Sequence, residues 1–328
     1  MNIEHTHWHP VAALSDVGTQ PLAVTLLGED LVLWRDSDQV LHAWLDRCPH
    51  RGARLSMGRV VGQRLECPYH GWQFDGQGRC RVVPAQPGFT PPASQGLRPL
   101  AVQQALGLCW VRLQGAVEAD GHPVPHAPPI EGLRQVLCGP YDVATSAPRI
   151  VENFLDMAHF GFVHEGWLGD RELTEVPAYE VTDTLQGVLA TGCKAWQPRS
   201  NLHSLAPAQV EYRYEVTAPY TAWLTKVPEP GSTRVADWRE SIGLMICPQT
   251  PETSRVWFLL AVADHETPDQ ALQDFQHTIF TQDQPVLESQ RPRCLPLDLR
   301  AEQHTVADRM SSAYRRYLQR SGITFGVC

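Results

Sequence analysis

The sequence predicts an α+β protein of two domains, an all-β domain followed by a domain that combines an antiparallel sheet with helices. The chain has 328 residues, enough for two domains of ~150 residues each. Short segments of alternating apolar and polar residues fill the first third, as expected for strands. A proline-rich stretch then precedes a second half in which strand-like and helix-like spacings are mixed.

The first domain is expected to span 1–120. Turn signals such as Asp75-Gly76 separate its short apolar segments. Its clearest strands are Leu31–Arg35, Val40–Trp44 and Leu108–Leu113. Residues 121–130 are rich in proline and can continue neither a helix nor a central strand, so they are the predicted linker.

The second domain is expected to span 131–328. Its alternating segments predict an antiparallel sheet, and the first part of 150–164 predicts a helix. Apolar residues recur at helical spacing over 268–282 and 301–319, so a long helix is expected at the end of the domain. The predicted strands lie around 179–195, 208–227, 239–248 and 254–264.

Charge and apolar pattern exclude several classes of protein. The net charge is −9, whereas a protein that binds a nucleic-acid backbone needs a basic stripe. No apolar stretch approaches the ~18 residues of a membrane span, and the first residues do not resemble a signal peptide. Nine scattered cysteines, an odd number, favour a reducing compartment. We therefore expect a cytoplasmic protein with neither nucleic-acid nor membrane partners.

The strongest chemical signal is a pair of short segments that each mix one cysteine with one histidine. Cys48-Pro49-His50 is followed, after 16 residues, by Cys67-Pro68-Tyr69-His70. In a Rieske [2Fe–2S] centre two thiolates hold one iron and two imidazoles hold the other. The pattern therefore predicts a [2Fe–2S] cluster bound by Cys48, His50, Cys67 and His70.

A structural zinc site with the same four ligands is the alternative. A zinc finger would pair C-x2-C with H-x3–5-H, whereas each half here mixes the two ligand types. Both halves are expected on hairpin tips, where Gly52 and Gly71 allow tight backbone around the cluster. Trp72 follows the second half and is expected to shield it.

A second signal lies in the segment from Glu152 to Glu165. His159 and His164 are five residues apart, about 140° on an ideal helix, so a regular helix would not make them converge. Gly161 between them would permit the backbone to unwind. With a carboxylate from elsewhere, the two histidines would form the 2-His-1-carboxylate face of a non-haem Fe(II) site.

Together these segments resemble the Rieske non-haem iron ring-hydroxylating oxygenase family. The resemblance rests on Cys48–Gly52 and Cys67–Asp75, and it extends from Trp8 to Tyr317. The segment from Gly78 to Pro87 resembles the branch of vanillate and dicamba O-demethylases and pheophorbide a oxygenase. The resemblance implies a Rieske domain followed by a helix-grip catalytic domain, in which an antiparallel sheet wraps a long helix.

The resemblance also implies roles for residues of the second domain. Asn153-x2-Asp156-x2-His159-x4-His164 is similar to the iron motif of the family, with the two histidines as ligands. The segment 278–290 resembles the one that supplies the third ligand, which makes Asp283 the choice. Asp274 and Glu288 are its rivals. Asn153 and Asp156 are the further catalytic residues, and Asp156 is expected to carry electrons between a cluster histidine of one subunit and an iron-bound histidine of the next in a homotrimer.

The activity implied by the resemblance is that of a terminal oxygenase in a multicomponent monooxygenase. With O2 as co-substrate and two supplied electrons, it would hydroxylate a C–H bond of an aromatic or heterocyclic compound, with formaldehyde released if the carbon is an O- or N-methyl group. The chain has no G-x-G-x-x-G fingerprint and no C-x4-C-x2-C ferredoxin run. Electrons from NAD(P)H would therefore arrive through a separate reductase or ferredoxin.

Two other functions stay open at this point. The chain could be the α subunit of a cis-dihydroxylating dioxygenase, with a small β subunit, or a Rieske electron-transfer protein with an extra domain. Only an oxygenase needs the mononuclear site.

The substrate pocket is expected to include residues that precede Asp283 on one helix face. Phe275, Gln276 and Ile279 lie 8, 7 and 4 residues before it, and Leu272 could join them. This predicts a mostly apolar cavity with one amide. The histidines at 5, 7 and 9 and the remaining seven cysteines are not expected to bind a metal.

Overall fold

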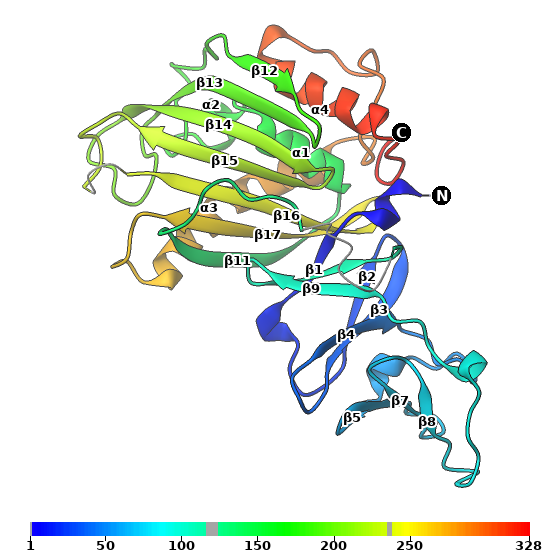
Figure 1. Cartoon of the computed structure of the whole chain (residues 1–328). Helices are drawn as coiled ribbons and strands as arrows, with labels where there is room; N and C mark the ends of the chain where they lie inside the picture. Colours follow the sequence, from blue (N-terminus) through cyan, green and yellow to red (C-terminus); the bar gives the residue numbers. More distant parts are fainter. Residues whose placement is uncertain (1, 116–123, 235–237) are drawn as a thin grey trace. The chain divides into compact units, whose positions relative to one another are not determined.

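A computed structural model describes residues 2–115, 124–234 and 238–328. It divides into two compact units, Asn2–Val124 and Pro125–Cys328. Residues 116–120 of the predicted first domain and 121–123 of the predicted linker lie outside the described residues. The two units are coloured blue to cyan and green to red in Figure 1.

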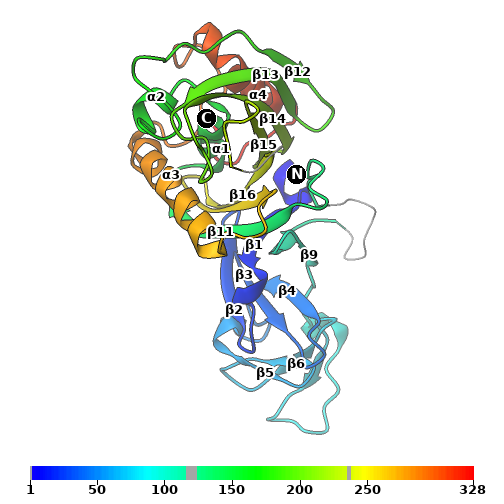
Figure 2. The same cartoon turned by 90° about the vertical axis from the view of Figure 1, so that its left-hand side faces the viewer.

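The N-terminal unit consists of three small antiparallel sheets, because its strands are short and separated by tight turns. Figure 2 shows β2, β3 and β4 beside one another. The three predicted strands correspond to β3, β4 and β10. The sheets are formed by β1 (His9–Ala13), β10 (Leu108–Arg112) and β9 (Ala101–Ala105); by β2 (Leu22–Leu26), β3 (Glu29–Arg35) and β4 (Leu41–Leu45); and by β5 (Arg59–Val61), β6 (Arg64–Glu66), β7 (Gln73–Asp75) and β8 (Cys80–Val82).

The two cysteine–histidine segments lie in different kinds of loop. Cys67–Gly71 is the tip of the β6–β7 hairpin, as predicted. Cys48–Gly52 follows β4 and is not a hairpin tip, because β4 and β5 belong to different sheets. Both loops close on themselves, since the amide of Gly52 donates to the Cys48 carbonyl and that of Gly71 to the Cys67 carbonyl. Gly52 and Gly71 have φ of +73° and +68°, which glycine adopts without strain.

The C-terminal unit is built on a seven-stranded antiparallel sheet of order β11-β17-β16-β15-β14-β13-β12 (Figure 1). Consecutive strands from β12 to β17 pair as neighbours, and β11 adds to β17. The predicted strands are all present. The strands are β11 (Arg134–Val143), β12 (Glu180–Asp183), β13 (Val188–Gln197), β14 (Ala208–Ala218), β15 (Thr221–Pro228), β16 (Glu240–Thr250) and β17 (Thr253–Val262).

Helices pack against this sheet. The helix α1 (Ala147–Leu155) contacts β15 and β16, and α3 (Asp269–Ser289) lies along β11. The short α2 (Phe160–Val163) follows α1, and α4 (Arg309–Arg320) covers β12 and β13. This arrangement confirms the predicted fold class.

The helix boundaries differ from those expected. The predicted helix over 268–282 continues to Ser289 through Pro285, because buried Leu287 and a bond from the Ala144 amide to Glu288 hold its last turn. The predicted helix over 301–319 begins only at Arg309, after Thr305 and Asp308 bond each other's backbone. The longest helix is therefore α3 and not the one at the end of the chain.

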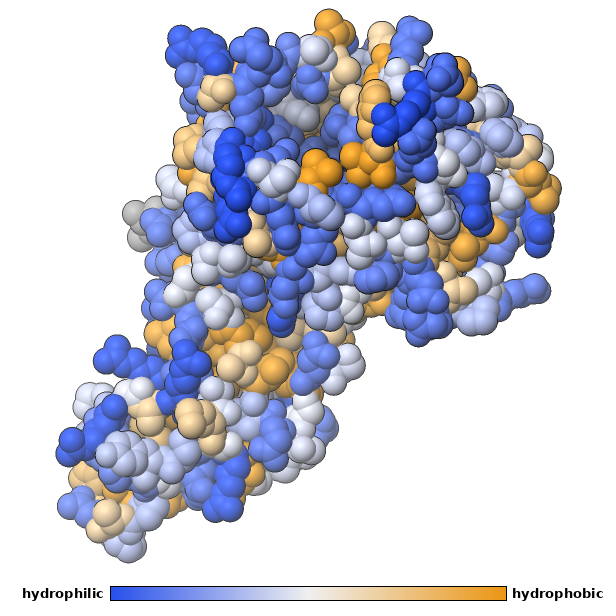
Figure 3. All heavy atoms as spheres, turned by 180° about the vertical axis from the view of Figure 1, so that it is seen from behind, coloured by the Kyte–Doolittle hydropathy of each residue, from blue (hydrophilic) through white to orange (hydrophobic). Residues whose placement is uncertain are grey.

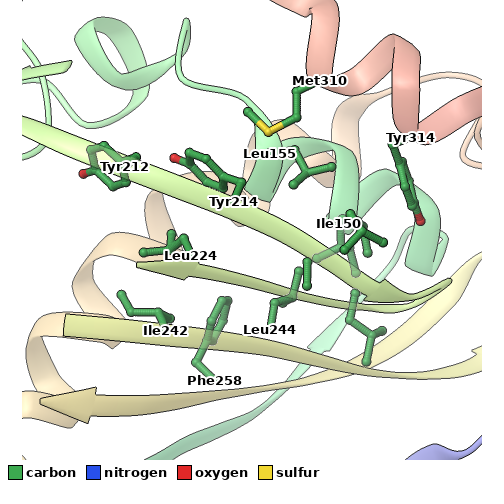
Figure 4. Packing of buried hydrophobic residues seen from close by; sticks show 14 of the residues in the cluster. Ile150, Leu155, Tyr212, Tyr214, Leu224, Ile242, Leu244, Phe258, Met310 and Tyr314 are labelled. Atoms are coloured by element: carbon green, nitrogen blue, oxygen red, sulfur yellow. The ribbon is translucent and has the colours of Figure 1, made fainter. Parts of the chain in front are cut away.

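The core of this unit lies between the sheet and the helices. Figure 4 shows Tyr214, Leu224, Ile242 and Phe258 on the sheet face that looks toward Ile150 of α1. The face of the molecule in Figure 3 is covered mainly by hydrophilic residues, with smaller hydrophobic areas between them. Among the described residues, no helix has the length and apolarity needed to cross a membrane.

Candidate metal centres and substrate cavity

The four residues of the first motif form a sulfur pair and an imidazole pair. The thiols of Cys48 and Cys67 are buried and within hydrogen-bonding reach of each other. The rings of His50 and His70 are exposed, with centroids 4.5 Å apart. Sulfur therefore faces the interior and imidazole faces the surface of the unit.

This arrangement fits a two-iron cluster better than a zinc ion. The ligand atoms of a tetrahedral zinc site lie within about 3.8 Å of one another. Among the described residues, the only group of three or more His, Cys, Asp or Glu with ligand atoms all within 4.8 Å is His159, His164 and Asp283. The cysteine–histidine set therefore does not converge on a single ion, as two irons with separate ligand pairs require.

The surroundings also suit a cluster. Burial and the neighbouring Cys67 raise the pKa of the Cys48 thiol to about 12, so its thiolate needs a cation beside it. The backbone amides of His50 and Arg51 point at the Cys48 sulfur. Trp72 stacks on His50, with ring centroids 4.6 Å apart and planes 6° apart, and so covers one side of the loop pair.

The second motif brings two histidines and one acid together. Nε2 of His159 lies 3.2 Å from Nε2 of His164, and Oδ1 of Asp283 lies 3.4 Å and 3.2 Å from these two nitrogens. Ligands about 2.1 Å from a metal at right angles would be about 3.0 Å apart, so the triangle has the size of one face of an iron site. Burial by itself would lower the pKa of His164, but the Asp283 carboxylate and the Gln282 side-chain carbonyl raise it above its usual value. These neighbours stabilise a positive charge, as expected at a site that binds a cation.

The chain unwinds between the helices that carry these ligands. The helix α1 ends at Leu155, and Asp156 is extended with φ −87° and ψ 137°. His159 is the N-cap residue of α2, so the break comes before the first histidine. The sequence had suggested a break at Gly161 instead. Gly161 has another role, since a Cβ on it would lie 2.8 Å from the Asp170 carbonyl oxygen. Because Gly161 has no side chain, the loop that contains Asp170 can pack closely against it.

Three side chains orient the triad. Nδ1 of His159 is 2.9 Å from Oδ2 of Asp156, and Nδ1 of His164 is 2.8 Å from Oε1 of Gln282. Asn153 donates from Nδ2 to Asp283 Oδ1 at 3.3 Å. Both histidines therefore present Nε2 to the metal position. The role of Gln282 was not predicted from the sequence, although this residue is the neighbour of Asp283 in the chain.

The rival acids lie elsewhere. Asp274 is exposed and accepts a hydrogen bond from Gln270. Glu288 accepts bonds from the Ala144 amide and from Gln284. Neither belongs to the group around His159 and His164.

A cavity opens beside the triad, with about 920 Å³ of empty space that includes the solvent at its mouth. Leu272, Phe275, Gln276 and Ile279 line it from α3, as predicted, together with side chains of the inner face of the sheet. Most of the lining is apolar. The polar exceptions away from the triad include Asn201, Tyr212, Tyr214, Lys226, Glu240 and Gln276.

The chain is similar to known oxygenase components over nearly its whole length. The family model of the Rieske [2Fe-2S] domain matches residues 7–101, and that of the vanillate O-demethylase oxygenase C-terminal domain matches 143–322. Methylxanthine N1-demethylase NdmA of Pseudomonas putida is 32% identical over 95% of this chain and 87% of its own. The oxygenase component of dicamba O-demethylase from Stenotrophomonas maltophilia is 35% identical over 50% of this chain and 48% of its own.

A solved structure has the same fold. NdmA from Pseudomonas putida with caffeine superposes with a TM-score of 0.83 at 30% identity, and the match covers 97% of this chain and 90% of that one.

Fold and site thus define an oxygenase with a Rieske cluster and a mononuclear iron. The chain belongs to the Rieske non-haem iron oxygenase family, in the group of demethylase oxygenase components. It is an oxidoreductase that acts on a small molecule and receives electrons from a reductase. The sequence-based predictions of family, fold class, cofactors and enzyme class are confirmed.

Proposed function

We propose that this oxygenase removes a methyl group from a nitrogen or oxygen atom of an aromatic or heterocyclic substrate and releases it as formaldehyde. The observation that carries the proposal is the triangle of His159, His164 and Asp283 in the wall of a large, mainly apolar cavity. Relatives named as N- and O-demethylases, one of them along nearly the whole chain, support it.

In this proposal His159, His164 and Asp283 hold the mononuclear iron, and Cys48, His50, Cys67 and His70 hold the cluster. Iron in such a site, supplied with electrons, activates O2 for insertion of one oxygen atom into a C–H bond. Hydroxylation of a methyl carbon gives an unstable hemiaminal or hemiacetal, which breaks its bond to nitrogen or oxygen and yields formaldehyde.

The protein side chains prepare this chemistry. Asp156 and Gln282 fix the tautomers of the two histidines, and Asn153 orients the Asp283 carboxylate. The apolar wall formed by Leu272, Phe275 and Ile279 excludes water from the substrate and holds its ring by contact.

This proposal also includes the assembly of subunits and the location of the protein in the cell. We infer a homotrimer in which Asp156 links the cluster of one subunit to the iron of the next. A cyclic head-to-tail interface of this kind can close at three subunits. A cytoplasmic location fits the expected supply of electrons from an NAD(P)H-dependent reductase.

The test is substrate-dependent O2 uptake with a surrogate reductase and detection of formaldehyde. We expect methylated heterocycles to stimulate uptake and to yield formaldehyde with the demethylated product. A cis-diol product without formaldehyde would instead identify a dihydroxylating dioxygenase, and the absence of any stimulated uptake would contradict the proposal.

A further inference from the structure

A buried ion pair lies in the wall of the substrate cavity. Lys226 of β15 and Glu240 of β16 are direct register partners, and their Nζ and Oε2 atoms are 2.8 Å apart. Both side chains are more than nine-tenths buried, and both line the cavity. The Lys226 ammonium also donates to the Ser200 carbonyl at 2.7 Å.

Stability alone does not explain this pair. Moving two charges out of water costs about as much as their attraction returns, so apolar residues of similar size would serve the fold equally well. The neighbouring cavity positions of the same two strands are indeed apolar, with Leu224 opposite Ile242. Figure 4 shows Leu224 between Tyr214 and Ile242 on the same face of the sheet.

Polar atoms in the same cavity wall are left for a ligand or water to satisfy. Oε2 of Glu240 is at ion-pair distance from Lys226 but accepts no well-directed hydrogen bond from the described residues. The Tyr214 hydroxyl and the Trp238 indole N–H are also buried without a hydrogen-bond partner among the described residues. Both residues line the same cavity. Buried polar groups without partners are uncommon, so these two, in the cavity wall that also holds the ion pair, favour a ligand with a polar edge.

We propose that Lys226 and Glu240 recognise a neutral lactam or cyclic amide edge of the substrate, an inference that rests on the proposed function. The Lys226 ammonium donates to the ring carbonyl, and the Glu240 carboxylate accepts the adjacent ring N–H. The two charges cancel, so the pair attracts a dipole more than an ion. A carboxylate substrate is disfavoured because it would lie against Glu240.

The first experiment compares three bicyclic probes by calorimetry with the oxidised holoenzyme, without reductant, so that nothing turns over. The probes are 2-quinolinone, quinoline and quinoline-2-carboxylate. We expect 2-quinolinone to bind about tenfold or more tightly than either of the others, because only it satisfies both members of the pair. Equal affinities, preference for the carboxylate, or no binding of 2-quinolinone would overturn the proposal. This ranking needs no variant and therefore does not depend on how a variant folds.

The second experiment uses Lys226→Met and Glu240→Gln, with Lys194→Met and Glu211→Gln as matched controls. Lys194 and Glu211 are also register partners in this sheet, but both are exposed and neither lines the cavity. Lys226→Met and Glu240→Gln should each reduce the preference for 2-quinolinone to about threefold or less, and Glu240→Gln should strengthen carboxylate binding because Lys226 is left unpaired. The controls should keep all three dissociation constants within about twofold.

A pair with only a structural role would lower thermal stability in both cavity variants and leave the ranking unchanged, which would refute the assignment. The binding data are independent of catalysis. An absence of formaldehyde with every substrate would contradict the proposed demethylation and leave the ranking intact, whereas loss of the ranking alone would contradict only the lactam assignment.

Discussion

His159 and His164 each use both ring nitrogens. Nε2 points to the common centre with Asp283, and Nδ1 is held by Asp156 or Gln282. A histidine fixed in this way has one tautomer and one ring orientation, so the metal position is prepared before any ion binds. The roles of these side chains can be separated by substitution.

Asp283→Ala should abolish turnover and remove most of the mononuclear iron, because the site loses its only anionic ligand. The cluster, which lies in the other unit, should keep its visible absorbance. Iron analysis of the purified variant checks this, with exposed Asp274→Ala on the same helix as the control. Parental iron content and activity in Asp283→Ala would move the third ligand to another acid.

Asp156→Asn should keep both metal sites but slow the transfer of electrons to the mononuclear iron severely. An amide has one acceptor atom, whereas the carboxylate can accept N–H groups from two imidazoles. In the parent, the bonds from His159 and the Ala158 amide lower the pKa of Asp156 against the effect of burial, so the group is a carboxylate at neutral pH. Single turnover of pre-reduced enzyme with substrate and O2 measures the rate of cluster oxidation. An unchanged rate would rule out the bridging role.

At the scale of elements, α1 is held by an ionic network that contains two buried arginines, Arg149 and Arg315. Arg315 of α4 makes two hydrogen bonds to Glu152 of α1, at 2.6 Å and 2.9 Å, and a third to Glu302. Arg149 of α1 also bonds Glu302 twice. Because Asn153 follows directly after Glu152, this network sets the position of the helix that presents Asn153 and Asp156 to the triad.

Glu302→Gln should lower the free energy of unfolding by about 2 kcal/mol at pH 7, because two arginines lose their shared carboxylate. Burial opposes ionisation, but Arg149 and Arg315 lower the pKa of Glu302 to about 2. Its contribution is therefore present above the unfolded pKa of about 4.3 and is lost as the pH falls toward 2. Urea unfolding at pH 7 and pH 3.5 should show a difference between parent and variant that narrows at the lower pH. A constant difference would mean that Glu302 is not ionised in the network.

Prediction from sequence succeeded where the signal is local. The two cysteine–histidine segments and the Asn153–His164 segment each contain their residues within a few positions, and alternation located the strands from β12 to β17 of the large sheet. The strand β11 of that sheet was not predicted. Prediction failed where tertiary contacts decide. The extension of α3 past Pro285 depends on Ala144, far away in the chain. The Lys226–Glu240 pair depends on strand register, which a single strand does not reveal.

At the scale of the whole molecule, two kinds of metal centre in one chain predict about three irons per chain, two in the cluster and one in the mononuclear site. Iron and protein analysis of anaerobically purified enzyme checks this number. An electron-transfer protein with only a cluster would contain about two irons per chain, and that result would contradict the oxygenase assignment.

The proposed trimer is tested by light scattering of the eluting holoenzyme. We expect a mass three times that of the chain, and we expect Asp156→Asn to retain it, because that substitution removes one hydrogen-bond acceptor and leaves the rest of the interface intact. A monomer with full activity would contradict transfer between subunits.

One face of α3 carries both a wall of the cavity and the proposed iron ligand Asp283. Leu272, Gln276, Ile279 and Asp283 follow one another at helical spacing along the cavity, and Pro285 comes two residues later. Because one helix carries all four side chains, a change that shifts its backbone at Gln276 or Ile279 would also shift Asp283. Substitutions in the two parts of the cavity wall should therefore have different effects. Substitutions on β15 and β16 should change which substrates bind while the iron ligands stay in place. Substitutions on α3 should change both the choice of substrate and the geometry of the metal site.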